Sequence, residues 1–358
     1  MKTNRNIIVG ITLIASLCGA SISQAGNNDR AGQAGAGQLL INPWAQSSGW
    51  GGANSGSVRG VESMFLNIAG IAFTQKTQIA FSNTAWMKGS GITINAFGLT
   101  QKISDAGVLG LGVTSMGFGE IPVTTTELPE GGLGNFTPRF INVSLSYAKA
   151  FSNSIYGGIN TKMISESISD VGTEGIAFDA GIHYVTGIGK GSDGKKNTDN
   201  LKFGITLKNV GPQMRYRGDG LSLRGIAAST GSTLTFEQRS ERFEMPSLVN
   251  IGGAYDYKIS DMHRVTFAGN FTSNSFTENQ YIGGVEYGFR SYFMLRTGYV
   301  WEAGKHTGAS VNAFTGLCAG LSANLPLGKS GKTFGIDYSF RETQPFQNTH
   351  SVGVRMDL

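Results

Sequence analysis

Apolar and polar residues alternate with a period of two along most of the chain, from about residue 78 to its end. In one such segment Ile141, Val143 and Leu145 fall on one face, and Asn142 and Ser144 fall on the other. Successive side chains of a β-strand point to opposite sides of a sheet, so the pattern predicts strands with one apolar and one polar face. Each segment spans about ten residues, the length that a tilted strand needs to cross a bilayer.

Fourteen such segments can be counted. They begin near residues 78, 91, 107, 137, 154, 175, 200, 248, 263, 278, 292, 309, 332 and 348. The two long connections, residues 117–136 and 209–247, follow the third and seventh segments and so fall at the same end. Bacterial outer-membrane barrels have an even number of strands, short periplasmic turns and long external loops. The sequence therefore predicts an all-β fold, a closed antiparallel transmembrane β-barrel of about 14 strands, although the polar connection at residues 189–200 is long for a periplasmic turn.

A secreted β-sandwich or solenoid would show the same alternation, because it also buries one face of each strand. The chain has only 8 prolines for so many turns, whereas it has 53 glycines and only 15% charged residues. Large aromatic residues stand near the ends of the apolar faces, as in an interfacial girdle; they are Tyr257, Phe289, Trp301 and Phe340. These features favour the barrel.

The first 25 residues have the layout of a secretory signal peptide. Lys2 and Arg5 precede an apolar run over residues 7–18, and residues 23–25 (Ser-Gln-Ala) form a small-x-small cleavage site. Cys18 also allows a lipoprotein signal, but the leucine before it fits that alternative poorly. We therefore expect export and residence in the outer membrane of a Gram-negative bacterium, as a multi-pass protein.

Residues 26–76 are rich in glycine and do not alternate. Irregular backbone cannot face lipid, but it can sit inside a water-filled barrel. The segment is therefore predicted to be an N-terminal hatch or plug, with a loose periplasmic tail as the alternative, and residues 77–358 are predicted to be the barrel.

Two short motifs in this segment resemble those of a known family. Residues 48–53 (Ser-Gly-Trp-Gly-Gly-Ala) and 67–73 (Asn-Ile-Ala-Gly-Ile-Ala-Phe) resemble the GMGGA and NPAGLA motifs of PorV/PorQ-family outer-membrane proteins. Trp50 and Ile68 replace the methionine and the proline of these motifs, and the chain ends on Leu358 where an aromatic residue is usual. The resemblance implies a FadL-like barrel and assigns the hatch motif to Gly49, Gly51, Gly52, Asn67, Ala69 and Gly70.

The same resemblance implies a function. PorV-type proteins are non-enzymatic parts of the type IX secretion system, which bind the C-terminal domains of secreted cargo and the outer-membrane translocon and pass cargo to the surface attachment complex. The alternative is a FadL-like transporter of hydrophobic small molecules. Such a conduit needs a continuous apolar groove at the hatch, and the polar inner faces predicted here favour the cargo binder.

Two sets of residues are candidates for binding. The first lies on the polar faces of the later strands and comprises Asp179, Glu286, Arg296, Asp337 and Arg355. These side chains either form a charge-balanced lumen that holds the hatch or line a path for a polar ligand. The second set belongs to the external loop at residues 209–247 and comprises Arg215, Tyr216, Arg217, Leu221 and Arg224. Arginine mixed with aromatic residues suits a protein partner, and the arginines also suit anionic lipopolysaccharide.

The sequence offers no catalytic constellation, metal site or cofactor motif. The 4 histidines have no metal-ligand spacing, and Cys318 alone can form neither an internal disulfide nor a thiolate cluster. A net charge of +5 without a basic cluster argues against nucleic acid as a partner.

Overall fold

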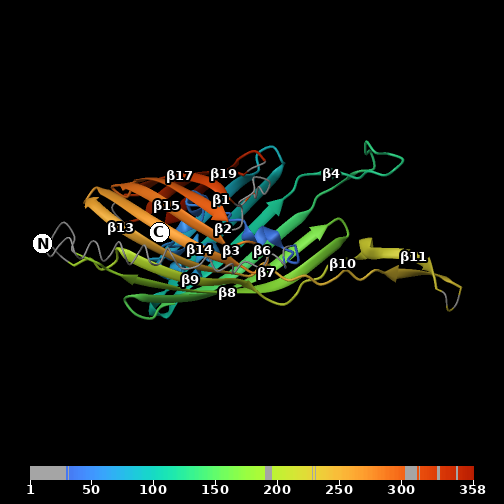
Figure 1. Cartoon of the computed structure of the whole chain (residues 1–358), viewed down its shortest axis with the longest axis horizontal. Coiled ribbons are helices and arrows are strands. Elements are labelled where there is room, and N and C mark those ends of the chain that lie inside the picture. Colours follow the sequence, from blue (N-terminus) through green and yellow to red (C-terminus); the bar gives the residue numbers. More distant parts are fainter. Residues whose placement is uncertain are drawn as a thin grey trace.

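A computed structural model describes residues 30, 32–189, 196–227, 229, 231–302, 313, 315–328, 331–343 and 346–358, and an antiparallel β-barrel dominates this part of the chain (Figure 1). Its fourteen spanning strands are β1 (Thr77–Trp86), β2 (Ile92–Ile103), β3 (Gly107–Gly117), β6 (Arg139–Ala150), β7 (Ile155–Ile168), β8 (Val171–Thr186), β9 (Leu201–Val210), β13 (Leu248–Ser260), β14 (His263–Asn274), β15 (Gln280–Phe289), β16 (Phe293–Glu302), β17 (Gly316–Pro326), β18 (Thr333–Arg341) and β19 (Thr349–Asp357). The two-residue β10 (Arg217–Gly218) adds to the outer part of β8.

The barrel closes where the first strand meets the last. β1 pairs with β19 in antiparallel register, with Phe81 opposite Val354. Closure gives the edge groups of both strands a hydrogen-bonding partner, which the hydrocarbon core of a membrane could not supply. The predicted closed barrel of fourteen strands is confirmed. Of the predicted strand starts, residue 309 lies outside the described residues.

The two faces of each strand differ as a bilayer requires. On the outer face Leu145 and Ile159 are each 61% exposed and Leu295 is 63% exposed, whereas Ala148 and Arg296 on the inner face are almost fully buried. Apolar side chains thus cover the outside, where lipid would solvate them, and polar side chains collect inside.

The two long connections leave the barrel at the same end, as predicted (Figure 1). The connection between β3 and β6 contains β4 (Ile121–Pro122) and β5 (Asn135–Phe136). The connection between β9 and β13 contains β10, the 3-10 turn η6 (Asp219–Leu221) and a hairpin of β11 (Ser222–Ile226) and β12 (Thr233–Glu237). We call this end of the barrel the loop end. The opposite end, the turn end, includes the β6–β7 turn and the short η5 (Ser104–Ala106) between β2 and β3.

The described residues before β1 fill the interior of the barrel as a chain of short helical segments (Figure 1). These are η2 (Gly37–Leu40), α2 (Ala45–Ser48), η3 (Ala53–Gly56), α3 (Ser63–Leu66) and η4 (Ile68–Phe73). Val61, Ala69 and Ile71 have no exposed surface. We call residues 32–76 the hatch. The predicted signal peptide and the first residues of the predicted hatch, 26–29 and 31, lie outside the described part of the chain.

No helix within the described residues is both long enough and apolar enough to cross a membrane.

The topology predicts which ends of the barrel a reagent can reach. In a barrel with its loop end outward, Ile226→Cys in the β11–β12 hairpin should react with a membrane-impermeant thiol reagent on intact cells. Asn153→Cys in the β6–β7 turn should react only after the cells are permeabilised, and native Cys318 is buried and should contribute little background. Labelling of Asn153→Cys alone on intact cells would invert the orientation.

Candidate functional site: the hatch and the cavities beside it

The first hatch motif needs glycine because the hatch touches the wall backbone to backbone. A Cβ on Gly49 would lie 2.9 Å from the Cα of Gly320 in β17, closer than real contacts allow. Gly51 and Gly52 have φ angles of +65° and +92°, in the left-handed region that glycine adopts without strain. A side chain at these positions would push the turn off the wall or strain it.

The second hatch motif is a hydrogen-bonded clamp on β8. The amide nitrogen of Asn67 donates to the carbonyl of Ile182 at 3.1 Å, and its amide oxygen accepts from the N–H of Ala69 at 3.2 Å. Ala69 is fully buried, and a Cβ on Gly70 would lie 2.3 Å from the carbonyl oxygen of Val58. Asn67 thus ties the start of η4 to the wall, while Gly70 lets two hatch segments meet.

Trp50, which stands where the related motif has methionine, fills a gap in the wall. Gly284 of β15 and Gly298 of β16 face each other in register. A Cβ on Gly284 would lie 2.8 Å from the Trp50 ring, and one on Gly298 would lie 2.1 Å from the Trp50 carbonyl oxygen. This glycine pair leaves the space that the indole occupies.

Two of the charged inner-face residues, Arg296 and Arg355, contact the hatch, and Glu286 and Arg355 also line a cavity beside it. Arg296 donates to Glu286 at 2.9 Å and reaches the carbonyl of Gln46 in α2 at 3.5 Å. Arg264 forms a second ion pair with Glu286, at 3.1 Å. Arg296 and Glu286 are buried, and burying a charge is costly unless it is paired. These partners therefore offset the cost of burying the two charges.

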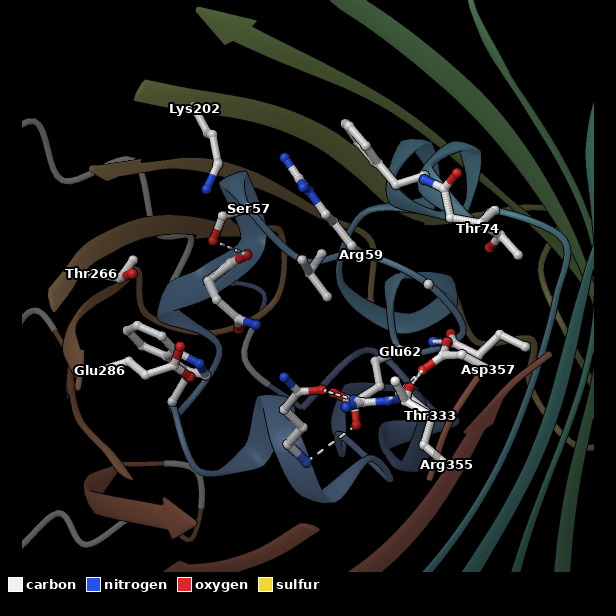
Figure 2. Close-up of a pocket in the computed structure, with 18 of the residues that line it drawn as sticks. Ser57, Arg59, Glu62, Thr74, Lys202, Thr266, Glu286, Thr333, Arg355 and Asp357 are labelled. Carbon is white, nitrogen blue, oxygen red and sulfur yellow. Dashed lines mark hydrogen bonds and ion pairs between the residues drawn. The ribbon is translucent and has the colours of Figure 1, made fainter. Parts of the chain in front are cut away.

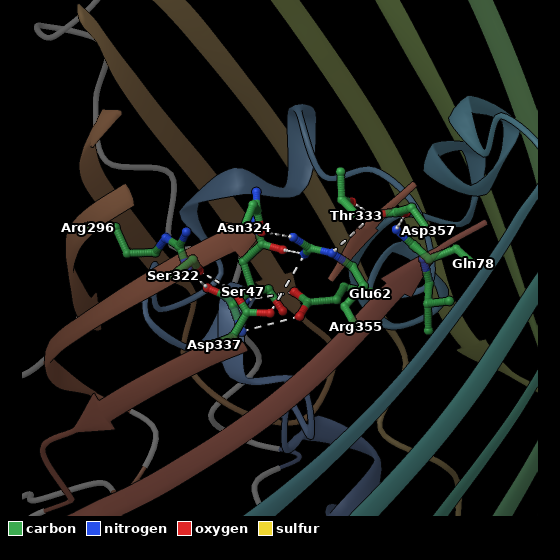
Figure 3. A network of polar contacts seen from close by, with 12 residues as sticks. Ser47, Glu62, Gln78, Arg296, Ser322, Asn324, Thr333, Asp337, Arg355 and Asp357 are labelled. Carbon is green, nitrogen blue, oxygen red and sulfur yellow. Dashed lines mark hydrogen bonds and ion pairs between the residues drawn. The ribbon is translucent and has the colours of Figure 1, made fainter. Parts of the chain in front are cut away.

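A second polar cluster surrounds Glu62, a hatch residue between the two motifs (Figure 3). Its carboxylate accepts hydrogen bonds from the backbone N–H groups of Gln46 and Ser47, at 3.2 and 2.8 Å. Arg355 of β19 donates to the side chain of Gln46 and lies 3.7 Å from Asp337 of β18. Burial and the Asp337 charge raise the pKa of the Glu62 carboxyl from 4.5 to about 7, against the opposing effect of Arg355 and Arg296.

Asp179 supports the wall itself. It accepts from Lys162 of β7 in an ion pair of 2.6 Å and from the backbone N–H of Asn209 at 2.8 Å. The register of β8 and β9 shifts between Phe178 and Ala180, and Asn209 has a φ of +58°. Asp179 thus satisfies the groups that this β-bulge leaves unpaired.

A polar cavity of 480 Å³ opens beside the hatch near the turn end (Figure 2). Hatch residues Gln46, Trp50 and Asn54 line one side, and charged residues of the strand ends line the other side. The charged lining residues of this turn-end cavity are Arg59, Glu62, Lys76, Lys202, Asp256, Arg264, Glu286, Arg355 and Asp357.

A second cavity of 350 Å³ lies near the loop end. The hatch contributes Leu40, Phe65 and Leu66 to it, whereas the wall contributes mostly amides and hydroxyls together with Lys208 and Arg341. The wall residues of this loop-end cavity include Leu248, Asn250, Asn270, Thr272, Asn274 and Ile282.

The two cavities share one hatch turn. Gln46, Trp50 and Asn54 face the turn-end cavity, and Ser48, Gly51 and Gly52 face the loop-end cavity. Because one cavity lies toward each end of the barrel, residues 46–54 form the partition between them.

The external-loop candidates separate into two groups. The Tyr216 hydroxyl donates to Glu166 of β7 at 2.5 Å, while Arg215 and Arg217 line a third cavity beside it. Leu221 lies in η6, and Arg224 is exposed on β11. The loop is therefore not one cluster.

No group of three or more His, Cys, Asp or Glu side chains that could hold a metal is found in the described parts of the chain. Cys318 is fully buried, and its sulfur would lie 3.2 Å from a Cβ placed on Gly51.

Sequence reasoning missed Phe65 and Lys208, which meet across the loop-end cavity with the Lys208 ammonium 3.6 Å from the Phe65 ring centre. Lys208 lies on the buried, inner face of β9, but nothing in the sequence indicates which hatch residue it contacts. Gln46 and Glu62 were missed for the same reason.

The Asn67 clamp predicts a cost in stability. Asn67→Ala leaves the Ile182 carbonyl and the Ala69 N–H without this partner, so hatch docking should weaken by about 1–3 kcal/mol. Hydrogen exchange of residues 63–73, followed by mass spectrometry, should rise while exchange of the β-strands stays unchanged. Asn153→Ala, in an exposed turn, is the matched control; equal exchange in the two variants would contradict the clamp.

The raised pKa of Glu62 predicts a pH dependence with a definite sign. Docking favours the protonated carboxyl, so the docked hatch binds more protons than the undocked hatch between pH 4.5 and about 7. Docking should therefore weaken as the pH rises through this window. In a Trp86→Phe/Trp301→Phe background, where Trp44 and Trp50 report on the hatch, the guanidinium midpoint of tryptophan fluorescence should fall from pH 5 to pH 8, and Glu62→Gln should reduce that fall. An undiminished fall in the variant would assign the effect to another group.

No family model matches the sequence, and no curated protein matches it. Solved structures do match in fold. CymD, a monoaromatic hydrocarbon channel, has 13% sequence identity and a TM-score of 0.51, with 88% of this chain and 97% of that chain covered. The Pseudomonas putida toluene transporter TodX has 11% identity and a TM-score of 0.50, with the same coverage. A Pseudomonas aeruginosa FadL homologue has 11% identity and a TM-score of 0.45, over 87% of this chain and 96% of that chain.

At these identities the likeness concerns the fold alone: the chain is a FadL-like barrel that resembles Gram-negative outer-membrane proteins. The resemblance to PorV/PorQ proteins and to type IX secretion gains no support from these comparisons.

Proposed function

We propose that this barrel resides in the outer membrane and carries small hydrophobic molecules across it, with the hatch as gate. The observation that carries the proposal is the pair of cavities that residues 46–54 line from opposite sides. Displacement of this turn would let a molecule pass from the loop-end cavity to the turn-end cavity.

The chemistry of the loop-end cavity supports an apolar ligand body. Leu40, Phe65 and Leu66 supply an apolar surface, and the volume of 350 Å³ falls within the range of small-molecule sites. Three polar side chains of the opposite wall already bond to one another. Asn270 donates to Asn250 at 3.3 Å and to Thr272 at 2.9 Å. These amides therefore need no polar ligand.

The fold neighbours support the same class of cargo. One is a toluene transporter and another is a monoaromatic hydrocarbon channel. That this chain carries similar molecules is part of the proposal.

Protein binding in type IX secretion is the second candidate. The observation that favours it is the apolar face of the exposed β11–β12 hairpin, on which Leu223 and Phe236 pair, 49% and 41% exposed. Deletion of residues 222–237 should abolish copurification of a protein partner if this candidate holds, and should leave solute passage intact if the barrel is a conduit.

A disulfide can test the gate. A Cβ on Gly51 would lie 3.7 Å from the Cβ of Cys318, within the Cβ–Cβ range of about 3.5–4.5 Å of natural disulfides. Gly51→Cys should therefore link the partition turn to β17. In oxidised cells that express this variant, entry of the fluorescent hydrophobic probe N-phenyl-1-naphthylamine should fall to the rate of cells without the protein. A reductant should restore entry.

Two controls isolate the cross-link. Gly51→Ser imposes a similar backbone strain without a disulfide, and Gly51→Cys combined with Cys318→Ser removes the partner thiol. Both should respond neither to oxidation nor to reduction. Wild-type probe entry through a barrel whose cross-link is verified by mass spectrometry would rule out residues 46–54 as the gate.

A further inference from the structure

A third cavity, of 720 Å³, lies at the loop end beside the tips of β7 and β8. We call it the rim cavity. Strand residues line one side, and the long β9–β13 connection lines the other with Gln213, Met214, Arg215, Arg217 and Arg242. Met214 is its one large apolar lining residue, so the rim cavity differs in chemistry from the loop-end cavity.

Three arginines surround this space: Arg215, Arg217 and Arg242. In the described part of the chain, none of them forms an ion pair with a carboxylate. The Nε of Arg215 is buried and has no hydrogen-bond partner within the described residues. Guanidinium groups arranged in this way suit a carboxylate or a phosphate, which can accept two parallel hydrogen bonds.

The opposite wall offers groups for hydroxyls. Glu166 is 7% exposed; its Oε2 accepts from Tyr216, but its Oε1 has no partner among the described residues. The hydroxyl of Thr173, which is 4% exposed and pairs in register with Glu166, also has none. Buried polar atoms nearly always have hydrogen-bond partners, and a ligand with several hydroxyl groups would supply them here.

We propose that the rim cavity binds an acidic sugar, whose acid group meets the arginines and whose hydroxyls meet Glu166 and Thr173. A mixed lining of arginine, carboxylate and hydroxyl fits a molecule that carries both a negative charge and hydrogen-bond donors. Neither a simple anion nor a neutral sugar satisfies both sides.

Tyr216 holds the two sides together. Its hydroxyl binds Glu166, its carbonyl accepts from Ser240 at 2.8 Å, and its ring lies 5.4 Å from that of Phe243. Ligand binding on this frame therefore needs no ordering of a free loop.

An acidic sugar can reach this site from two sources. One is the phosphorylated or acidic core saccharide of lipopolysaccharide, which surrounds the outer rim of such barrels, and the other is a soluble sugar acid. Both have the same recognisable chemistry.

Calorimetric titration of the detergent-purified full chain tests the site with glucuronate, glucose 6-phosphate, glucose and inorganic phosphate as probes. Both acidic sugars should bind saturably, and glucose and phosphate should each bind at least about tenfold more weakly because each lacks one half of the contacts. Arg215→Gln and Glu166→Gln should each weaken glucuronate binding by about tenfold or more.

The matched control is Arg239→Gln, which removes an exposed arginine of the same connection that does not line the cavity. It should leave binding unchanged. All variants are first checked for barrel folding by heat-modifiable gel mobility. Failure of both acidic sugars to bind, phosphate binding as tight as glucuronate binding, or equal losses in Arg239→Gln and Arg215→Gln would each overturn the proposal.

The source is identified by competition. Lipopolysaccharide with a complete core should displace glucuronate if lipopolysaccharide is the ligand, and lipid A without core sugars should not. If neither displaces it, the ligand is a soluble sugar acid. The Gly51→Cys cross-link separates the test of this site from the test of the proposed conduit. It should block the conduit and leave sugar binding intact.

Discussion

One constraint governs the structure: every backbone N–H and C=O group of the hatch needs a hydrogen-bond partner, and lipid cannot supply one. Residues 32–76 form only short helical segments, so the terminal N–H and C=O groups of each segment lack the regular partners that a long helix provides. Such backbone is tolerated at membrane depth only inside protein or water. The barrel supplies that interior. Its inner wall is shaped for the hatch by glycines such as Gly284 and Gly298 and by polar groups that reach hatch atoms.

Because of this constraint, polar side chains on the inner faces of the strands bind the hatch or one another. Taken alone, polar residues facing a lumen indicate a polar passage. In the folded protein Arg296 and Arg355 are directed to Gln46 of the hatch, and the amides near the loop end bond to one another. The space that remains there is lined by Leu40, Phe65 and Leu66 of the hatch and by mostly polar side chains of the wall. The apolar surface of that cavity therefore depends on the hatch as well as on the wall.

The buried charges at the hatch fix the position of α2 more than they stabilise the fold. Removing charges from water is costly even when they are paired, yet Glu62, Glu286 and Arg296 are all buried. Their hydrogen bonds have strict geometry, and an apolar contact would not fix the height or rotation of α2 in the same way. Docking of the hatch through such contacts can also respond to protonation, because burial and the Asp337 charge raise the pKa of Glu62 to about 7.

The sequence by itself determined the barrel. Alternation has a period of two in every strand, and one face of each strand must meet lipid, so the strand number, the inward and outward faces and the common end of the long loops could be predicted locally. The glycines of the hatch motifs were predicted from the resemblance to the PorV/PorQ motifs, and the φ angles of Gly51 and Gly52 lie in the left-handed region that glycine adopts without strain. Only the tertiary structure decided which residues meet. Phe65 and Lys208 are 143 positions apart, and Glu166 and Tyr216 are 50 apart; no periodicity links such pairs. Cavities arise from the mismatch of two packed surfaces, and that mismatch exists only once the hatch lies against the wall.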